Sequence, residues 1–192
     1  MSAGTFDSSL PVIGHVAVEG WSDIANGAIH PLFNPAQILV VLGLALLLGR
    51  QQPLRVRRPM WVFMSAVAIA LGLTLAGASL GAPVPVLTGL SLCLGTLIAI
   101  GWQIPDNAIY PICLVAGVSL GLDSGVESGG AVAIAKTFTG TWLGLGVLVA
   151  YVALASSNAS GKKWAETGVR VIGSWIVAIS LLVLAFSLKE AR

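Results

Sequence analysis

The chain has 192 residues, of which 56% are hydrophobic and only 9% are charged, and its formal net charge is +2. A soluble domain carries about 25% charged residues, so this composition excludes an ordinary soluble protein and predicts an all-α integral membrane protein whose main partner is the lipid bilayer. The small net charge gives no electrostatic basis for binding nucleic acid.

The first thirty residues contain a polar stripe. After a segment, residues 1–14, that we expect to be flexible, six polar side chains recur at helical spacing: His15, Glu19, Ser22, Asp23, Asn26 and His30. They fall within about 100° of one helical face, which predicts an amphipathic outer helix over residues 15–34. Pro31 should kink or break this helix, because proline has no N–H and clashes with the preceding turn, and we expect the break at His30 to Asn34. Asn34 and Pro35 are then typical of the N-cap and first position of a new helix.

Two interpretations of this segment remain open. A helix broken at membrane depth is tolerated where protein or a water-filled cavity surrounds it, and broken helices often supply ion sites in transporters. Alternatively, the outer helix lies on the membrane surface with its polar stripe in water.

Residues 35–188 predict a compact bundle of six transmembrane helices. The expected spans are residues 35–48, 60–80, 86–102, 108–122, 131–155 and 168–188. Short segments that contain Gly, Pro or charged residues separate them. The first span is shorter than the roughly twenty residues that a bilayer requires, and this shortfall is met if its helix extends backwards through the polar stripe.

Positively charged residues predict the orientation. The Arg50–Arg58 loop holds four arginines, and the loop before the sixth span holds Lys162 and Lys163. With six spans these two loops lie on one side, which the positive-inside rule makes cytoplasmic. Both termini then lie outside, and we expect an inner-membrane protein of a bacterium.

The same orientation brings candidate cation ligands together at the outer face. Asp123 and Glu127 are spaced as neighbours on one helical face, where two carboxylates repel each other unless a cation is near. Lys136 lies in an apolar segment, which is costly without a partner. It is either a structural counter-ion to these carboxylates or a residue that tunes a transport site. Carboxylates with the imidazole of His30 would suit a divalent first-row metal.

The expected site has two groups of residues. The candidate metal ligands are His30, Asp123, Glu127 and Asp23, and the candidate tuning residues are Lys136, Asn26 and Glu19. The sequence has no Ser-His-Asp arrangement, no nucleotide-binding glycine loop and no Cys-x-x-Cys pair. We therefore expect no enzyme and no firmly implied cofactor, and a divalent metal ion would be cargo.

Glycines at four-residue spacing predict where helices pack closely. They are Gly117, Gly121 and Gly125 in the fourth segment, and Gly140 and Gly144 in the fifth. Small residues at this spacing let helix backbones approach each other in a membrane.

Two short segments carry a resemblance to a known family. The run from His30 to Gln37 resembles the pattern His-Pro-Leu-x-Gly-x-Asp-His of the HupE/UreJ membrane proteins, and the run from Leu120 to Glu127 resembles their pattern His-Gly-x-Ala-His-Gly-x-Glu. The resemblance covers most of the chain and implies nickel or cobalt uptake for hydrogenase and urease. His30, Pro31, Leu32, Gly121, Gly125 and Glu127 match these patterns.

The departures from the family patterns concern their histidines. Ala36 and Gln37 stand in place of the Asp-His pair, and Leu120 and Ser124 stand in place of the two histidines of the second pattern. Asp123 adds a carboxylate beside one lost histidine. The resemblance thus implies either a divergent branch whose site has shifted from nitrogen to oxygen ligands, or one that has lost transport.

Two functions from different classes follow from the sequence. The first is a membrane transporter that takes up a small cation, such as a divalent transition metal of the nickel or cobalt type, from an outer-facing vestibule. The second is a non-transporting structural or accessory subunit of a larger membrane complex. Its glycine-rich faces would pack against partner membrane subunits or against further copies of the chain.

Overall fold

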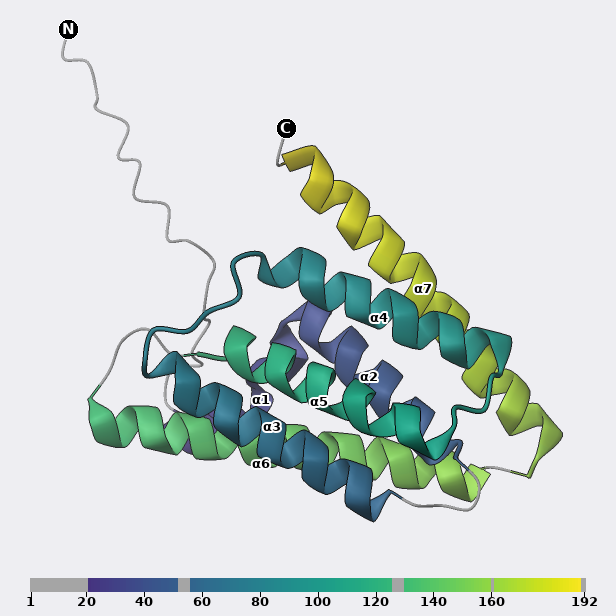
Figure 1. Cartoon of the computed structure of the whole chain (residues 1–192), viewed down its shortest axis with the longest axis horizontal. Coiled ribbons are helices and arrows are strands. Elements are labelled where there is room, and N and C mark those ends of the chain that lie inside the picture. The colour runs from purple at the N-terminus through teal and green to yellow at the C-terminus, as the bar shows by residue number, and fades with distance from the viewer. Residues whose placement is uncertain (1–20, 52–55, 126–129, 160, 191–192) are drawn as a thin grey trace, which may run out of the picture.

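The structure is a computed structural model that describes residues 21–51, 56–125, 130–159 and 161–190 (Figure 1). All regular secondary structure in these ranges is helical. The helices are α1 (Asp23–Phe33), α2 (Pro35–Gly49), α3 (Arg57–Thr74), α4 (Pro83–Ile100), α5 (Asp106–Asp123), α6 (Ala131–Ala159) and α7 (Lys163–Glu190).

Helix α2 lies at the centre of the bundle. Its residues are apolar on every face, and most of them are buried. Val40, Val41 and Leu44 are fully buried in one core with Phe63 of α3 and Leu94 of α4. A helix that is hydrophobic nearly all round can lie in a core or face lipid, and the burial of α2 shows that other helices surround it.

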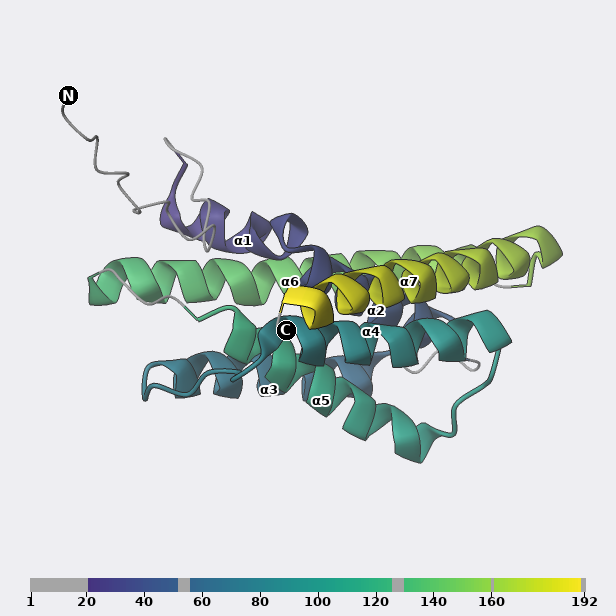
Figure 2. The ribbon, with the colours of Figure 1, turned by 90° about the horizontal axis from the view of Figure 1, so that it is seen from above.

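The helices pack in pairs whose directions are set by their contacts. Helices α3 and α5 run side by side in the same direction, and α1 runs along the first half of α6 in the same direction (Figure 2). Helices α4 and α7 run in opposite directions, because Ser91 contacts Ser180 and Ala99 contacts Arg170. From α2 to α7, successive helices therefore alternate in direction, as consecutive membrane crossings do.

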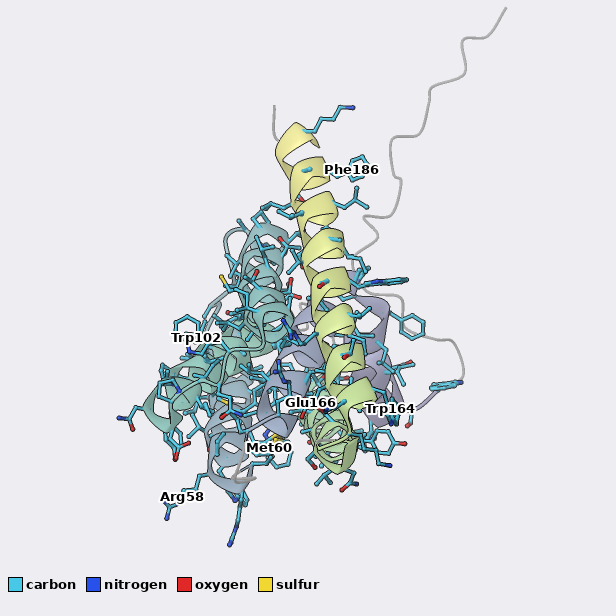
Figure 3. All side chains as sticks on the ribbon, turned by 90° about the vertical axis from the view of Figure 1, so that its right-hand side faces the viewer. Arg58, Met60, Trp102, Trp164, Glu166 and Phe186 are labelled. Carbon is cyan, nitrogen blue, oxygen red and sulfur yellow. The ribbon has the colours of Figure 1, made fainter. Side chains whose placement is uncertain are left out.

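The alternation gives the bundle two distinct ends. At the arginine end, which is on the right of Figure 1, α2, α4 and α6 finish and α3, α5 and α7 begin. This end carries Arg50, Arg57, Arg58 and Arg170, and Figure 3 views it directly. At the opposite end, which we name the Asp123 end, α5 finishes and α2 begins.

Three helices of the described chain are long and apolar enough to cross a membrane. They are α4, α6 over Ala131–Asn158, and α7 over Lys163–Ser187. The pair α1 and α2, bent by 82° at Asn34, adds a fourth if it counts as one broken span. Helices α3 and α5 each have 18 residues, about 27 Å of helix, but charged residues at their ends lower their mean hydropathy. The prediction of six spans therefore stays a prediction.

The break between α1 and α2 falls at Asn34, within the expected range from His30 to Asn34, although the helix does not break at Pro31 itself. Helix α1 continues through Pro31 and ends at Phe33, and Asn34 separates it from α2. Continuation is possible because the carbonyl of Gly27, which would otherwise accept the missing N–H of residue 31, accepts instead from the Thr141 hydroxyl at 3.2 Å.

The start of α1 is marked by a side-chain cap. Ser22 accepts a hydrogen bond from the Ala25 N–H, so the helix begins at Asp23. The expected flexible segment 1–14 and the first part of the polar stripe, with His15 and Glu19, lie outside the described residues.

Other helix boundaries differ from the expected spans by several residues. Helix α3 ends at Thr74 rather than near residue 80, because Gly77 adopts φ 85° and the Ala78 N–H turns back to the carbonyl of Leu73. This is the C-terminal arrangement that favours glycine. Helix α7 begins at Lys163, five residues before the expected start, and thus includes charged residues that hydropathy alone assigns to a loop.

Candidate polar site at the start of α2

Gln37 is the one polar side chain of α2, and it is completely buried. Its Nε2 donates a hydrogen bond of 2.6 Å to Oδ2 of Asp123, the last residue of α5. A second contact of 3.3 Å reaches the hydroxyl of Ser124. A polar residue inside an apolar helix requires partners, and here they come from the end of another helix.

Asn34 completes the polar cluster from the break between α1 and α2. Its Oδ1 accepts from the backbone N–H groups of Ala36 and Gln37, at 3.0 and 3.4 Å, and so caps α2. Its Nδ2 donates a hydrogen bond of 3.1 Å to Oδ2 of Asp123. The cap therefore sets the orientation of the amide, with its oxygen toward the helix and its nitrogen toward the carboxylate.

The position of Asp123 is favourable for a negative charge. The carboxylate accepts hydrogen bonds from Asn34 and Gln37, and hydrogen bonds to charged groups are the stronger ones. It also lies beside the N-terminus of α2, where the helix dipole places a partial positive charge. These interactions hold one carboxylate between the two helix ends.

One polar atom of the cluster has no partner within the described chain. Oε1 of Gln37 is buried and makes no hydrogen bond. The orientation of the amide is dictated by the carboxylate, which can accept but not donate, so Nε2 must face Asp123. A buried acceptor without a donor is costly, and a cation or a donor at this position would relieve that cost.

The chemistry of the cluster favours a small cation. Its oxygen atoms are the carboxylate of Asp123, the carbonyl oxygen of Gln37 and the hydroxyl of Ser124, which itself donates to the Leu120 carbonyl at 2.8 Å. Because Nε2 of Gln37 faces both Asp123 and Ser124, the carbonyl oxygen of Gln37 points away from these two groups. These are hard oxygen donors with one formal negative charge, a set that suits hard cations better than soft ones.

The other expected ligands are distributed differently. Asp23, Asn26 and His30 lie on α1, where all three are half-buried and where Asn26 and His30 each have a polar or electrostatic partner. Lys136 is exposed on α6. Glu127 and Glu19 lie outside the described residues. Across the part of the chain that the structure describes, no three His, Cys, Asp or Glu side chains come together as a metal group.

Sequence reasoning identified Asp123 but missed the residues that hold it. Asn34 was interpreted as a cap only, and Gln37 and Ser124 only as replacements for family histidines. The available signal was that Gln37 is the lone polar side chain among the fifteen residues of α2. In addition, Gln37 and Ser124 are 3.3 Å apart, so two histidine positions of the family patterns meet in space.

The glycines are placed at the close helix contacts of the bundle. A Cβ at Gly117 or Gly121 would meet backbone or side-chain atoms of α3 at 2.6 to 2.9 Å, and one at Gly125 would meet the side chain of Thr74 at 3.0 Å. At Gly140 and Gly144 a Cβ would overlap the backbone of α1. The first set joins α5 to α3, and the second joins α6 to the first half of α1.

Comparison with known protein families identifies a family for the chain. A family model described as HupE / UreJ protein matches residues 5–183. No curated protein and no solved structure matches the chain.

Proposed function

The chain belongs to the HupE / UreJ protein family, and from this premise we propose that it is an integral membrane transporter that takes up a small divalent cation through the site around Asp123. The family is associated with nickel or cobalt uptake, which supports transport of this class of ion. The proposal treats the chain as a transporter and not as an enzyme.

The observation that carries the proposal is the hydrogen bond between the buried Gln37 and the half-buried Asp123 at a break in a helical span. Asp123 is held between α2 and α5 by side-chain amides, and the carbonyl oxygen of Gln37 beside it has no partner. Discontinuous helices with an ionisable residue between their ends are a recurring form of ion site in transporters.

The donor set supports a hard divalent cation. Carboxylate, carbonyl and hydroxyl oxygens suit Mg²⁺, Ca²⁺ and Mn²⁺, whereas imidazole suits nickel. We therefore propose that replacement of family histidines by Gln37 and Ser124 has shifted selectivity toward Mn²⁺ among the first-row metals. Glu127 and His30, the other family-matched polar residues, are proposed to assist at the entrance.

Charge distribution supports an orientation for the proposed transporter. The arginine end would be cytoplasmic by the positive-inside rule, and the Asp123 end would face outside. Alternating directions from α2 to α7 are compatible with six crossings. The cation would then enter at the break near Asn34, driven by the membrane potential, since moving one charge across 100 mV releases about 2.3 kcal/mol.

The experiment that tests this proposal is metal accumulation in cells that express the chain. Manganese, iron, cobalt, nickel and zinc are screened with wild type, Asp123→Asn and Asp106→Asn. Asp106→Asn is the matched control, because it makes the same change at the other end of the same helix. Membrane content of each variant is measured, so that loss of accumulation is separated from loss of protein.

Transport predicts accumulation of at least one metal, which Asp123→Asn abolishes and Asp106→Asn retains. Equal accumulation by wild type and Asp123→Asn would overturn the assignment of the site. Absence of accumulation for all five metals would overturn uptake of a divalent first-row transition metal.

A second candidate function is a non-transporting accessory subunit of a membrane complex. It is favoured by one observation: no three-ligand metal group occurs within the described residues. This alternative predicts that the chain purifies with other membrane proteins in fixed ratio, and that Asp123→Asn leaves metal accumulation unchanged.

A further inference from the structure

Two arginines from different helices converge on the end of α4. Nη1 of Arg50, the residue that follows α2, donates a hydrogen bond of 2.8 Å to the carbonyl oxygen of Ile98. Nε of Arg170 on α7 donates a hydrogen bond of 3.0 Å to the carbonyl oxygen of Ala99. Atoms of both guanidinium groups lie within 3.5 Å of the place that a Cβ would take at Gly101. Two positive charges are thus held close together at the arginine end.

The convergence is electrostatically unfavourable without a further negative charge. Burial lowers the pKa of Arg50, the positive charge of Arg170 lowers it further, and Glu166 acts in the opposite direction. The C-terminus of α4 adds about half a negative charge. Among the described residues of this end, Arg50, Arg57, Arg58, Lys162, Lys163 and Arg170 stand against two acids, Asp106 and Glu166.

The arginine pair retains hydrogen-bonding capacity. A guanidinium carries five N–H donors in a planar fork, and the two carbonyl bonds use one from each residue. A phosphate group accepts two parallel hydrogen bonds from such a guanidinium group, and its negative charge compensates the positive charge of the arginines. Carbonyl oxygens alone would leave both positive charges in place.

The surroundings of the pair identify a lipid as the source of the phosphate. Trp102 and Trp164 are 63% and 73% exposed, and in Figure 3 Glu166 lies between them. Lys162 lies over the Trp164 ring at 6.0 Å. Exposed tryptophans and cationic side chains at helix ends are typical of the membrane interface, where lipid headgroups lie.

We propose that Arg50 and Arg170, at the end of α4, bind the phosphate of an anionic membrane lipid. The site lies between α2, α4 and α7 and joins three helices through one headgroup. It is independent of the cation site, which lies at the opposite end of the bundle.

The test measures lipid binding to the purified full chain by native mass spectrometry. Phosphatidylglycerol, phosphatidylcholine and inorganic phosphate are titrated separately into wild type, Arg170→Gln and Arg57→Gln. Arg170 is exposed, so its replacement should leave the fold intact, and thermal unfolding without lipid verifies this. Arg57→Gln removes the same charge from an exposed position at the same end.

We expect wild type to bind phosphatidylglycerol more tightly than phosphatidylcholine. Arg170→Gln should weaken that binding about tenfold, the size of a lost hydrogen bond between charged groups. Arg57→Gln should weaken it less than about threefold, because an exposed charge is screened. Equal affinity for both lipids, equal losses in both variants, or displacement of phosphatidylglycerol by millimolar inorganic phosphate would each overturn the proposal.

Discussion

The side-chain amide of Gln37 donates to the carboxylate of Asp123 across 2.6 Å and so joins the first turn of α2 to the last residue of α5, 86 positions later. Position 37 corresponds to the second histidine of the first family pattern. The side chain at this position therefore decides which donor atoms face Asp123 and Ser124.

Replacement of Gln37 by histidine should change metal selectivity. An imidazole at position 37 would place a nitrogen donor beside Asp123, and nitrogen donors favour nickel and cobalt over manganese. We expect Gln37→His to raise the ratio of nickel to manganese accumulation by about tenfold, equivalent to about 1.4 kcal/mol. The measurement is elemental analysis of cells grown with both metals.

Gln37→Leu is the control for this change. It removes the amide without adding a nitrogen donor, so it should lower accumulation of both metals and leave their ratio unchanged. If Gln37→Leu raised the ratio of nickel to manganese accumulation as much as Gln37→His, the effect could not come from the imidazole.

Gly140→Ala should destabilise the bundle. Its Cβ would overlap the backbone of α1 near Ile24, and a backbone cannot give way as a flexible side chain can. Overpacking of this kind costs about 1–3 kcal/mol. Thermal unfolding in detergent micelles is the measurement.

Gly72→Ala is the matched control, because a Cβ at Gly72 meets nothing within 4 Å and the residue lies in α3. Alanine is better than glycine in a helix by about 1 kcal/mol, so this variant should be slightly more stable. The two glycine-to-alanine substitutions are therefore predicted to change stability in opposite directions. A change in the same direction in both variants would contradict the packing argument.

Thr141→Val should weaken the attachment of α1 to α6. The Thr141 hydroxyl has one proton, which it shares between the carbonyls of Thr137 at 3.0 Å and Gly27 at 3.2 Å. Its loss leaves the Gly27 carbonyl without this donor, at a cost of about 1 kcal/mol. Stability is measured by thermal unfolding.

A double-mutant cycle with Pro31→Ala isolates the cause. Alanine at position 31 restores the backbone N–H that Gly27 would accept within the helix. Thr141→Val should then cost less in the Pro31→Ala background than in wild type. Equal costs in both backgrounds would show that Pro31 and Thr141 do not act on the same carbonyl.

Cysteine labelling tests the proposed orientation. Single cysteines replace Ser79, between α3 and α4, or Gln103, between α4 and α5, in a chain whose Cys93 and Cys113 are alanine; both new positions are exposed. A membrane-impermeant thiol reagent should label residue 79 on intact cells and residue 103 only after permeabilisation. The cysteine-free chain reports background, and the reverse pattern would exclude a cytoplasmic arginine end.

The sequence was sufficient to predict where most helices lie but not where they end. Apolar length located α2, α4, α5 and α6 to within a few residues, because membrane helices are defined by continuous hydrophobicity. Boundaries at Thr74 and Lys163 differed because they depend on Gly77 and on local capping, which hydropathy does not register. Pro31 predicts a kink or a break, yet α1 continues through it, because the Gly27 carbonyl accepts a hydrogen bond from Thr141, more than a hundred residues away.

The candidate site shows the same limit. Asp123 was predicted from its charge in an apolar chain, which is a local property. Its contacts with Asn34 and Gln37 depend on α2 and α5 meeting end to end, a tertiary relationship that no local pattern encodes.

The hydrogen bond between Thr141 and Gly27 spans 114 positions, and this has a consequence for biosynthesis. Helix α1 has eleven residues and emerges early in translation, yet the surface on which it packs is made only when α6 emerges. Helix α1 therefore docks only after α2 to α5 have been synthesised, and its docking is a late step of assembly. A truncated chain that ends before α6 should leave residues 23–33 open to protease, whereas the full chain should protect them.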